Sequence, residues 1–424
     1  MIVLVMVVLP VLLLILGIPI FLILLATAEV ALLFFKLPTT VVHQVMFDSL
    51  NKFPLLAVPF FIFTGDLMSR GGISARILRW VTSIIGTIRG SLAMTSLGLA
   101  AVFGAISGAT TATVAAVGSL TYPRMRKAGY SERFASALIT AEGAIDNLIP
   151  PSLGFIIYGV AAETSIVALF AAGIVPGLLL AGLFGVYIYY YAVRMGIRES
   201  QGFSWSEFFA ASRHGFLSLG AILIILGGIY SGIFSPTEAA GVACIYAIIV
   251  TYFIYREVTL RELFDIAART MYLTALIFII VAAAGLYAWL LTITGVAQTT
   301  SDFITGLQLP PWAILLLMNV LLLFIGCFLD TATSLLVLAP LLLPAAKAMG
   351  VDPIHFGVIV VMNLTIGTFT PPFGLNIFVC QALFKVPSRV LYPGLVPFIA
   401  LAIVALMLVT YIPALSLWIL KYLL

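Results

Sequence analysis

Two carboxylates, Asp146 and Asp330, stand inside long apolar stretches of this 424-residue chain. A carboxylate within lipid is costly and is a functional candidate by default, often as an ion contact. Both lie among hydroxyls, glycines and prolines, and clusters of oxygen ligands suit a hard cation. These residues therefore indicate cation binding, and for Asp330 a helix N-cap is an equal alternative, because Asp-Thr-Ala-Thr is a good capping sequence.

The oxygen-rich residues fall into four short stretches, which are 104–111, 146–151, 326–333 and 367–374. Two of them resemble hairpin tips, and the other two each contain a Pro-Pro pair. A helix that breaks inside a bilayer leaves carbonyls and amides without partners, which is tolerated only where they line a site. Free carbonyls suit sodium and helix N-termini suit an anion. We expect the four stretches to converge near the middle of the membrane, although small-residue helix packing explains any single hydroxyl equally well.

The amino-acid composition indicates whether the chain is surrounded by water or by lipid. Hydrophobic residues make up 63% of it, charged residues 8%, and the mean hydropathy is +1.24. A soluble domain carries roughly 25% charged residues, so most of this chain lies in lipid. Soluble enzymes, nucleic-acid binders and disordered scaffolds are excluded. The three cysteines have no metal or disulfide spacing, and no Walker A loop or nucleophile elbow is present.

Apolar runs indicate where the chain crosses the membrane. Runs long enough to span cover 54–69, 165–193, 216–234, 238–255, 271–292 and 395–419, while 2–35 is either one kinked helix or a span plus a surface segment. Shorter runs predict hairpins over 91–122 and 312–344 and broken helices over 134–163 and 354–384. If each hairpin enters and leaves on the same side and each broken helix crosses the membrane, sixteen of the 20 Lys and Arg residues lie on one side of the membrane, which is therefore the cytoplasmic side. Capping boxes at Ser204 and Thr259 predict two interfacial helices there.

A shift of 221 residues superposes the chain on itself. It brings together the helix-breaking residues Pro123 and Pro344, Gly129 and Gly350, Pro150-Pro151 and Pro371-Pro372, Gly173 and Gly394, and Pro176 and Pro397. The charge pattern gives the two copies opposite orientations, as in secondary transporters. The sequence predicts an all-α polytopic membrane protein with an inverted repeat, two re-entrant hairpins and two discontinuous helices. We assign 1–53 to an N-terminal scaffold, 54–193 to repeat 1, 194–270 to further scaffold spans and 271–424 to repeat 2.

Six motifs in order carry a resemblance to a known family. They are Leu-Ala-Val-Pro-Phe-Phe at 56–61, Gly-Gly-Ile at 71–73, Ile-Ser-Gly at 106–108, Leu-Ile-Pro-Pro-Ser at 148–152, Gly-Ile-Phe-Ser-Pro-Thr-Glu-Ala-Ala at 232–240 and Thr-Pro-Pro at 370–372. Their order and spacing, over nearly the whole chain, resemble the large membrane subunit of the tripartite ATP-independent periplasmic (TRAP) transporters. The resemblance implies a sodium-driven, elevator-type importer of a small organic anion across the bacterial inner membrane. Sialic acid, C4-dicarboxylates, keto acids and sulfonates all remain open as substrates.

The resemblance also implies partners and ligands. The partners are a small membrane subunit, a periplasmic substrate-binding protein and membrane lipid, with Na⁺ as the coupling ion, no organic cofactor and no nucleic acid. One implied sodium site uses Ser107, Asp146, Ile149 and Pro150, and the other uses Gly326, Gly367, Thr370 and Phe373, mostly through carbonyls. The candidates for substrate binding are Thr110, Thr111, Asn147, Asp330, Thr331, Thr333 and Asn376.

One position departs from the family pattern. The family usually has small, uncharged residues before the first Pro-Pro pair, whereas this chain has Asp146 and Asn147. The Asp146 side chain either strengthens a cation site or points away and leaves only its carbonyl. Two other function classes stay open at this point. An ion channel or passive pore would show conductance rather than saturable solute flux, and an intramembrane enzyme would need a nucleophile with a base or metal ligands, of which no set is apparent.

Overall fold

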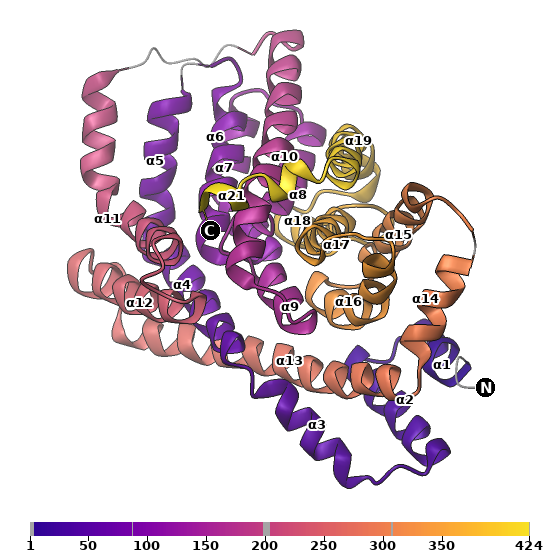
Figure 1. Cartoon of the computed structure of the whole chain (residues 1–424). Helices are drawn as coiled ribbons and strands as arrows, with labels where there is room; N and C mark the ends of the chain where they lie inside the picture. The colour runs from indigo at the N-terminus through magenta and orange to yellow at the C-terminus, as the bar shows by residue number, and fades with distance from the viewer. Residues whose placement is uncertain (1–3, 87, 198–203, 307, 424) are drawn as a thin grey trace.

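The computed structural model describes residues 4–86, 88–197, 204–306 and 308–423 (Figure 1). Within these ranges the chain is helical and contains no strand. The N-terminal helices are η1 (Leu4–Val8), α1 (Leu9–Ile15), α2 (Ile20–Phe35), α3 (Thr40–Leu50), η2 (Phe53–Leu56), α4 (Ala57–Arg70) and α5 (Ile73–Ile85). The next group is α6 (Ser91–Ser107), α7 (Thr110–Lys127), α8 (Glu132–Asp146), α9 (Leu153–Ala161) and α10 (Ile166–Arg194).

The second half of the chain contains the remaining helices. Its first elements are α11 (Trp205–Tyr230), α12 (Pro236–Ile248), η3 (Ile249–Ile254), α13 (Leu260–Ile293) and α14 (Val296–Gly306). They are followed by α15 (Pro311–Gly326), α16 (Thr331–Ala348), α17 (Pro353–Gly367), α18 (Leu375–Phe384), α19 (Ser388–Tyr411), α20 (Ala414–Leu417) and α21 (Leu420–Leu423).

Seven helical segments in the described part are long and apolar enough to cross a membrane: Phe53–Arg70, Ile166–Arg194, Trp205–Tyr230, Pro236–Ile254, Leu260–Ile293, Thr331–Ala348 and Ser388–Tyr411. Six of them overlap the spans expected from the sequence. The seventh, Thr331–Ala348, is one arm of an expected hairpin. Length and hydropathy therefore do not separate a complete span from a hairpin arm.

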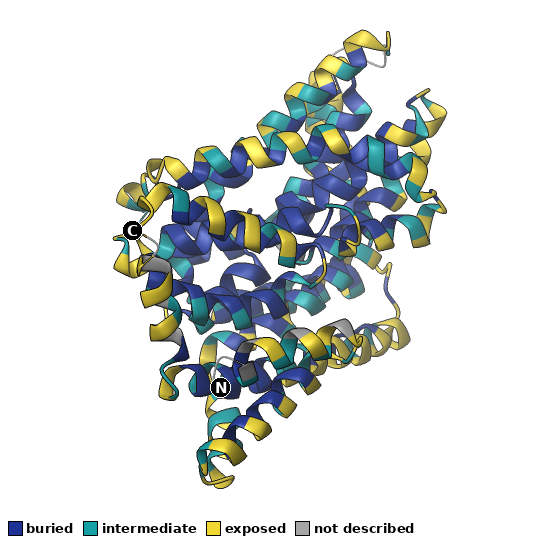
Figure 2. Cartoon of the chain, turned by 90° about the vertical axis from the view of Figure 1, so that its right-hand side faces the viewer, coloured by how far each residue is buried: buried dark blue, intermediate teal, exposed yellow. Residues whose placement is uncertain are grey.

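The helices are described in two groups. We call α2, α3, η2, α4, α11, α12 and α13 the outer frame, and α6 to α10 with α15 to α19 the inner bundle. In Figure 1, α13 crosses the lower part of the view below α9 and α16, with α2 and α3 packed on it. Figure 2 shows buried residues concentrated between the helices and exposed residues along their outer faces. Every residue of α8 from Phe134 and of α17 from His355 onward is buried, so the two broken helices lie at the centre of the inner bundle.

The predicted repeat is confirmed in the helix boundaries. A shift of 221 residues carries α7 onto α16 and α8 onto α17 residue for residue. The N-caps correspond as well, because the Ser131 side chain accepts from the Phe134 amide and Asp352 accepts from the amides of Ile354 and His355. Both hairpins and both broken helices expected from the sequence are present as pairs of helices, with α6–α7 and α8–α9 matched by α15–α16 and α17–α18.

One helix arrangement differs from the sequence-based expectation, and another decides between two alternatives that the sequence left open. The segments capped by Ser204 and Thr259 do not form separate helices, since each continues without a break into α11 or α13. At 1.5 Å per residue α13 is about 51 Å long, which exceeds the ~30 Å hydrocarbon core, so one helix can serve both at the surface and in the span. Within the described residues of the stretch 2–35, η1 and α1 form one continuous segment that is separate from α2, because Gly17 adopts a φ of 76° and Pro19 is the N-cap of α2.

Candidate ion and solute site

Each broken helix ends at a proline pair. Helix α8 stops at Asp146 and α9 starts at Leu153, with Pro150-Pro151 between them. Helix α17 stops at Gly367 and α18 starts at Leu375, with Pro371-Pro372 between them, and the bond within each pair is cis. Proline has no amide hydrogen and clashes with the preceding turn, so neither helix continues through its pair. The closing turn of each first segment takes up some of its last carbonyls, since that of Ile145 accepts from the Leu148 and Ile149 amides and that of Gly367 accepts from the Thr370 amide.

The first break packs against the first hairpin tip through Asp146, which is completely buried. The Thr113 hydroxyl on α7 donates to Asp146 Oδ2 at 2.5 Å. The backbone amides of Gly108 and Ala109 also face this carboxylate, although Oδ1 has no aligned hydrogen bond from a described group. A Cβ at Gly104 would lie only 2.6 Å from the Asp146 Cα, so a glycine is required where α6 passes this residue.

The second break packs against the second hairpin tip through close backbone contact and a pair of aromatic rings. A Cβ at Gly367 would lie 2.4 Å from the carbonyl carbon of Gly326, and one at Gly326 would lie 3.0 Å from the Leu364 oxygen. The Gly374 amide donates to the Cys327 carbonyl at 2.9 Å. The rings of Phe328 and Phe373 lie 5.2 Å apart at the same junction. Two glycines thus let the backbones of tip and break touch.

The two halves also contact each other. Asn147 Nδ2 in the first break donates to Thr365 Oγ1 on α17 at 3.3 Å, and Asn376 Nδ2 on α18 donates to the Thr140 carbonyl on α8 at 3.3 Å. Helix α9 packs against α16 and α17, while α18 packs against α7 and α8. The four oxygen-rich stretches therefore gather in one region of the inner bundle.

The remaining sequence-predicted residues take varied positions. Asp330 is the N-cap of α16, with Oδ2 accepting from the Thr333 amide at 3.0 Å, so its capping role is present. Thr110, Thr331 and Thr333 are buried, and Thr333 Oγ1 has no partner among the described residues. A Cβ at the intervening Gly143 would lie 3.0 Å from the Thr110 carbonyl and 2.9 Å from Asn376 Nδ2, which places these two candidates beside each other. Thr111 is half-buried, and the Ser107 side chain lies outside the described residues.

Both implied sodium sites contain oxygens that are free to accept a cation. In the described chain no backbone amide donates to the carbonyls of Asp146, Ile149 or Pro150, and Asp146 Oδ1 is buried without a partner. In the other set, the carbonyls of Gly326, Thr370 and Phe373 receive no amide from a described residue, while that of Gly367 accepts from Thr370 at 3.0 Å. A carbonyl has two lone pairs, so Gly367 can still bind an ion. The residues present therefore fit Na⁺, a hard cation bound by oxygen.

Several residues near the site were missed from the sequence. Thr113 follows Thr110 by three residues on one helix face, which is a weak signal that it faces the same way. Glu142, one helical turn before Asp146, is completely buried, with Oε1 accepting from Ser96 at 2.7 Å and Oε2 without a described partner. Ser96 is in turn 2.9 Å from Thr121 Oγ1. No sequence spacing linked these three residues, because they come from three different helices.

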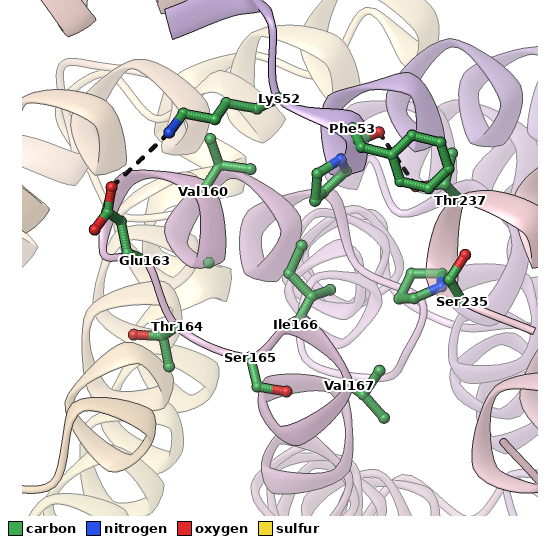
Figure 3. Close-up of a pocket in the computed structure, with 13 residues that line it drawn as sticks. Lys52, Phe53, Val160, Glu163, Thr164, Ser165, Ile166, Val167, Ser235 and Thr237 are labelled. Atoms are coloured by element: carbon green, nitrogen blue, oxygen red, sulfur yellow. Dashed lines mark hydrogen bonds and ion pairs between the residues drawn. The ribbon is translucent and has the colours of Figure 1, made fainter.

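Two cavities lie between the outer frame and the inner bundle, away from the hairpin tips. One has a volume of about 470 Å³ and lies between η2, the α9–α10 connection and the start of α12 (Figure 3). The other, about 460 Å³, lies between α3, α9, α13 and α16. Lys52 and Glu163 line both cavities and form an ion pair at 3.9 Å. Neither cavity is lined by a residue that the sequence assigned to an ion or solute site.

Comparisons with known proteins place this arrangement in a family. The family model of the tripartite ATP-independent periplasmic transporter, DctM component, matches residues 4–415. The isethionate TRAP transporter permease protein DctMQ of Oleidesulfovibrio alaskensis is 39% identical over 90% of this chain, which spans 60% of that protein's length. The ectoine/5-hydroxyectoine TRAP transporter large permease protein UehC of Ruegeria pomeroyi is 40% identical over 96% of both chains.

A solved structure has the same fold. The YdaH transporter of Alcanivorax borkumensis superposes with a TM-score of 0.53 at 14% sequence identity, covering 90% of this chain and 88% of that one. The relatives are transporter permeases rather than enzymes, and the seven apolar segments fit a multi-pass protein of the bacterial inner membrane. The chain therefore belongs to the DctM-component family of tripartite ATP-independent periplasmic transporters.

Proposed function

We propose that this chain is the transport subunit of a sodium-coupled importer of a small organic anion. The observation that carries the proposal is the junction of the first hairpin tip and the first break. There a completely buried carboxylate, Asp146, has one oxygen without a described partner and lies among carbonyls that accept no amide. A buried carboxylate whose charge is met only by hydrogen bonds, and by none at one of its oxygens, is costly in such a place, and a bound cation lowers that cost.

Sodium, when bound, supplies positive charge at both tip–break junctions. In the first junction Asp146 and the carbonyls of Ile149 and Pro150 would hold it, with Ser107 as a further ligand. In the second, the carbonyls of Gly326, Gly367, Thr370 and Phe373 would hold it. These atoms belong to both a hairpin tip and a break, so occupancy fixes each tip against its break and orders the groups beside it.

The half-helix N-termini differ in what they offer an anion. Among the four, α9 is capped by Ser152, α16 by Asp330, and α7 has the Asp146 carboxylate facing its first turn. Helix α18 begins at Gly374 without a side-chain cap, next to the exposed ring of Phe373, and among its described amides only that of Asn376 donates to a loop carbonyl, that of Thr368 at 2.9 Å. A helix N-terminus that lacks a side-chain cap attracts an anionic group. We place the acidic group of the solute at α18, with Asn376 of that helix as a polar contact and Thr331 and Thr333 of the second hairpin tip as further candidates.

Movement of the inner bundle against the outer frame would carry this site across the membrane. Support comes from the location of both cavities at the boundary between these two groups of helices. The coupling follows from differential binding, because cations that order the tips also favour the anion site beside them. The isethionate and ectoine relatives are named for solutes that each carry an acidic group. We leave open sialic acid, C4-dicarboxylates, keto acids and sulfonates as substrates here.

The partners follow from the family. A TRAP system has a small membrane subunit and a periplasmic substrate-binding protein, and the name DctMQ of one relative joins the large and small membrane components. We propose that both partners act with this chain, the small subunit beside the outer frame and the binding protein at the non-cytoplasmic face. Substrate selectivity would then depend largely on the binding protein.

Uptake in proteoliposomes tests the proposal. The chain is reconstituted with its small subunit, the binding protein is added outside, and uptake of the binding protein's own ligand is followed under an inward sodium gradient. We expect saturable uptake that disappears when choline replaces sodium and that needs no ATP. Uptake that ignores sodium, or conductance without saturable solute flux, contradicts the proposal, and the second result would indicate a channel.

A further inference from the structure

The ion pair between Lys52 and Glu163 joins the outer frame to the inner bundle. Lys52 precedes η2 in the frame, and Glu163 lies in the connection between α9 and α10 of the bundle. Figure 3 shows the two side chains reaching toward each other across the gap between these elements. By the charge pattern of the loops, Lys52 is one of only four basic residues on the non-cytoplasmic side, from which an importer is loaded.

The surroundings of the pair have the size and chemistry of a binding site for a small solute. The two cavities that share Lys52 and Glu163 measure about 470 and 460 Å³, within the usual range for small-molecule sites. The first is lined by the hydroxyl-bearing side chains of Thr164, Ser165, Ser235 and Thr237 and by the apolar side chains of Phe53, Ile166 and Val167. Ser165 Oγ accepts from the Ala168 amide, and no described acceptor receives its proton.

The pair itself is weak enough to be replaced. Its atoms are 3.9 Å apart, and the exposed fractions of the two side chains are 47% for Lys52 and 83% for Glu163. Exposed ion pairs of this kind contribute little to stability, because water screens both charges. The Lys52 ammonium has three hydrogens to donate, so an incoming carboxylate or sulfonate can take the place of Glu163 at small cost.

We propose that this crevice is an entry site for the solute, in which Lys52 receives the acidic group and Glu163 is the resident competitor for it. The inference rests on the proposed import of an organic anion. Because the crevice is formed by both the frame and the bundle, it exists only in one relative position of the two. A solute bound there lies on the loading side before sodium-dependent binding at the tips, and none of the implied sodium ligands lines the crevice.

Binding in sodium-free buffer tests the entry site apart from the tips. The purified complex of this chain with its small subunit is placed in lipid nanodiscs in choline chloride. Succinate and isethionate, as carboxylate and sulfonate probes, are titrated by calorimetry and by the fluorescence of Trp289, which lines the second cavity. We expect at least one probe to bind. Lys52→Gln should weaken its binding about threefold to fivefold, since exposed pairs contribute up to about 1 kcal/mol.

The direction in which a Glu163 variant changes probe binding distinguishes two roles of the ion pair. In one, Lys52 binds the solute and Glu163 competes for it; in the other, the pair only holds the frame against the bundle. Glu163→Gln removes the competitor and should tighten probe binding about twofold, and Lys52→Arg should keep most of it. Lys36→Gln is the matched control, because Lys36 is exposed on the same side but lines neither cavity. Three results would overturn the proposal. They are no probe binding at all, an equal loss of probe affinity in the Lys36 and Lys52 variants, and a loss of probe affinity in Glu163→Gln like that in Lys52→Gln. Sodium-independent uptake with intact Lys52-dependent binding would instead overturn the proposed sodium coupling alone.

Discussion

The two repeats place a carboxylate at the same helix N-terminus but take it from different elements. In repeat 2, Asp330 is the N-cap of α16 and bonds its own helix. The shift of 221 residues carries Asp330 back onto Ala109, the N-cap of α7, which has no polar side chain. There the carboxylate comes from Asp146, at the end of the broken helix, and Asp146 corresponds to Gly367 in repeat 2.

This exchange gives the two junctions different chemistry within one architecture. In repeat 2 the glycine leaves the backbones of tip and break in contact, so only carbonyls are available to an ion. In repeat 1 a side chain fills the same gap, and Gly104 makes room for it. We assign Asp146 two jobs: one oxygen accepts from Thr113 at the start of α7, and the other, which has no described partner, is the proposed cation contact.

Breaking the backbone contact of repeat 2 should have the largest effect. Gly367→Ala places a Cβ 2.4, 2.5 and 2.7 Å from three backbone atoms of Gly326, which cannot rotate away as a side chain would. Overpacking of a core commonly costs about 1–3 kcal/mol, and a backbone collision should reach or exceed the upper end. We expect loss of sodium-dependent uptake and a clear fall in the midpoint of thermal unfolding in nanodiscs.

A second glycine supplies the control for this variant. Gly241 on α12 has no atom within 4 Å of its built Cβ and no positive φ, so Gly241→Ala should be neutral or slightly stabilising. Equal behaviour of Gly367→Ala and Gly241→Ala would mean that tip and break do not touch in repeat 2, and the comparison between the two junctions would fail.

Removing the carboxylate of repeat 1 should have the next largest effect. Asp146→Ala leaves the first turn of α7 and the Thr113 hydroxyl without an acceptor in a buried place. Loss of a cap together with buried unsatisfied donors should cost about 2–3 kcal/mol. The apparent sodium affinity in uptake assays should weaken as well, whereas binding of the periplasmic protein should not change.

Restoring the cap from the other element separates the two jobs of Asp146. The double variant Ala109→Asp with Asp146→Ala copies the arrangement of repeat 2, because Ala109 already has the extended backbone of an N-cap. It should regain much of the unfolding midpoint but not the sodium affinity. If the sodium affinity also returns, the carboxylate acts only through the helix start; if sodium activation never changed in Asp146→Ala, its side chain is not an ion ligand.

Much of this architecture could be predicted from residues whose effect on the backbone is local, such as prolines and capping residues. The pairs Pro150-Pro151 and Pro371-Pro372 each end a helix, so the two breaks could be predicted, whereas the single prolines at 123, 176, 344 and 397 lie inside helices and marked the repeat by their spacing alone. The partners of Asp146 could not, because Thr113 is 33 residues away and their contact depends on how α7 packs on α8. The close approach of Gly326 and Gly367 could not be predicted either, because it depends on how α15 packs on α17. Capping boxes marked helix starts correctly, but a cap carries no information on where α11 and α13 end.

The cap of repeat 2 should matter less than its counterpart. Asp330 is only partly buried, so water can replace its side chain at the start of α16. Asp330→Ala should cost about 1 kcal/mol in stability, the ordinary value for an N-cap, and Asp330→Ser should recover most of it. Unfolding midpoints of the three proteins measure this. A loss as large as that of Asp146→Ala would show that Asp330 is more than a cap.

The smallest effect is expected at a second pair of equivalent positions, Glu142 and Asn363. Both are completely buried. Asn363 Nδ2 donates to Asn319 at 2.6 Å, whereas Glu142 accepts from Ser96 at 2.7 Å. The neutral amide at position 363 shows that this place in the bundle accommodates an uncharged group. Glu142→Gln keeps the shape and the acceptor for Ser96, so stability should change by less than about 1 kcal/mol.

Glu142→Leu is the matched variant for this position, because it keeps a similar volume but removes the acceptor. It should cost more than Glu142→Gln, since the Ser96 hydroxyl then loses a buried partner and keeps only its contact with Thr121. If Glu142→Gln instead abolishes sodium-dependent uptake while the protein stays folded, the charge of Glu142 is required. The first repeat would then differ from the second by two working carboxylates one helical turn apart, and not by the exchange at Asp146 alone.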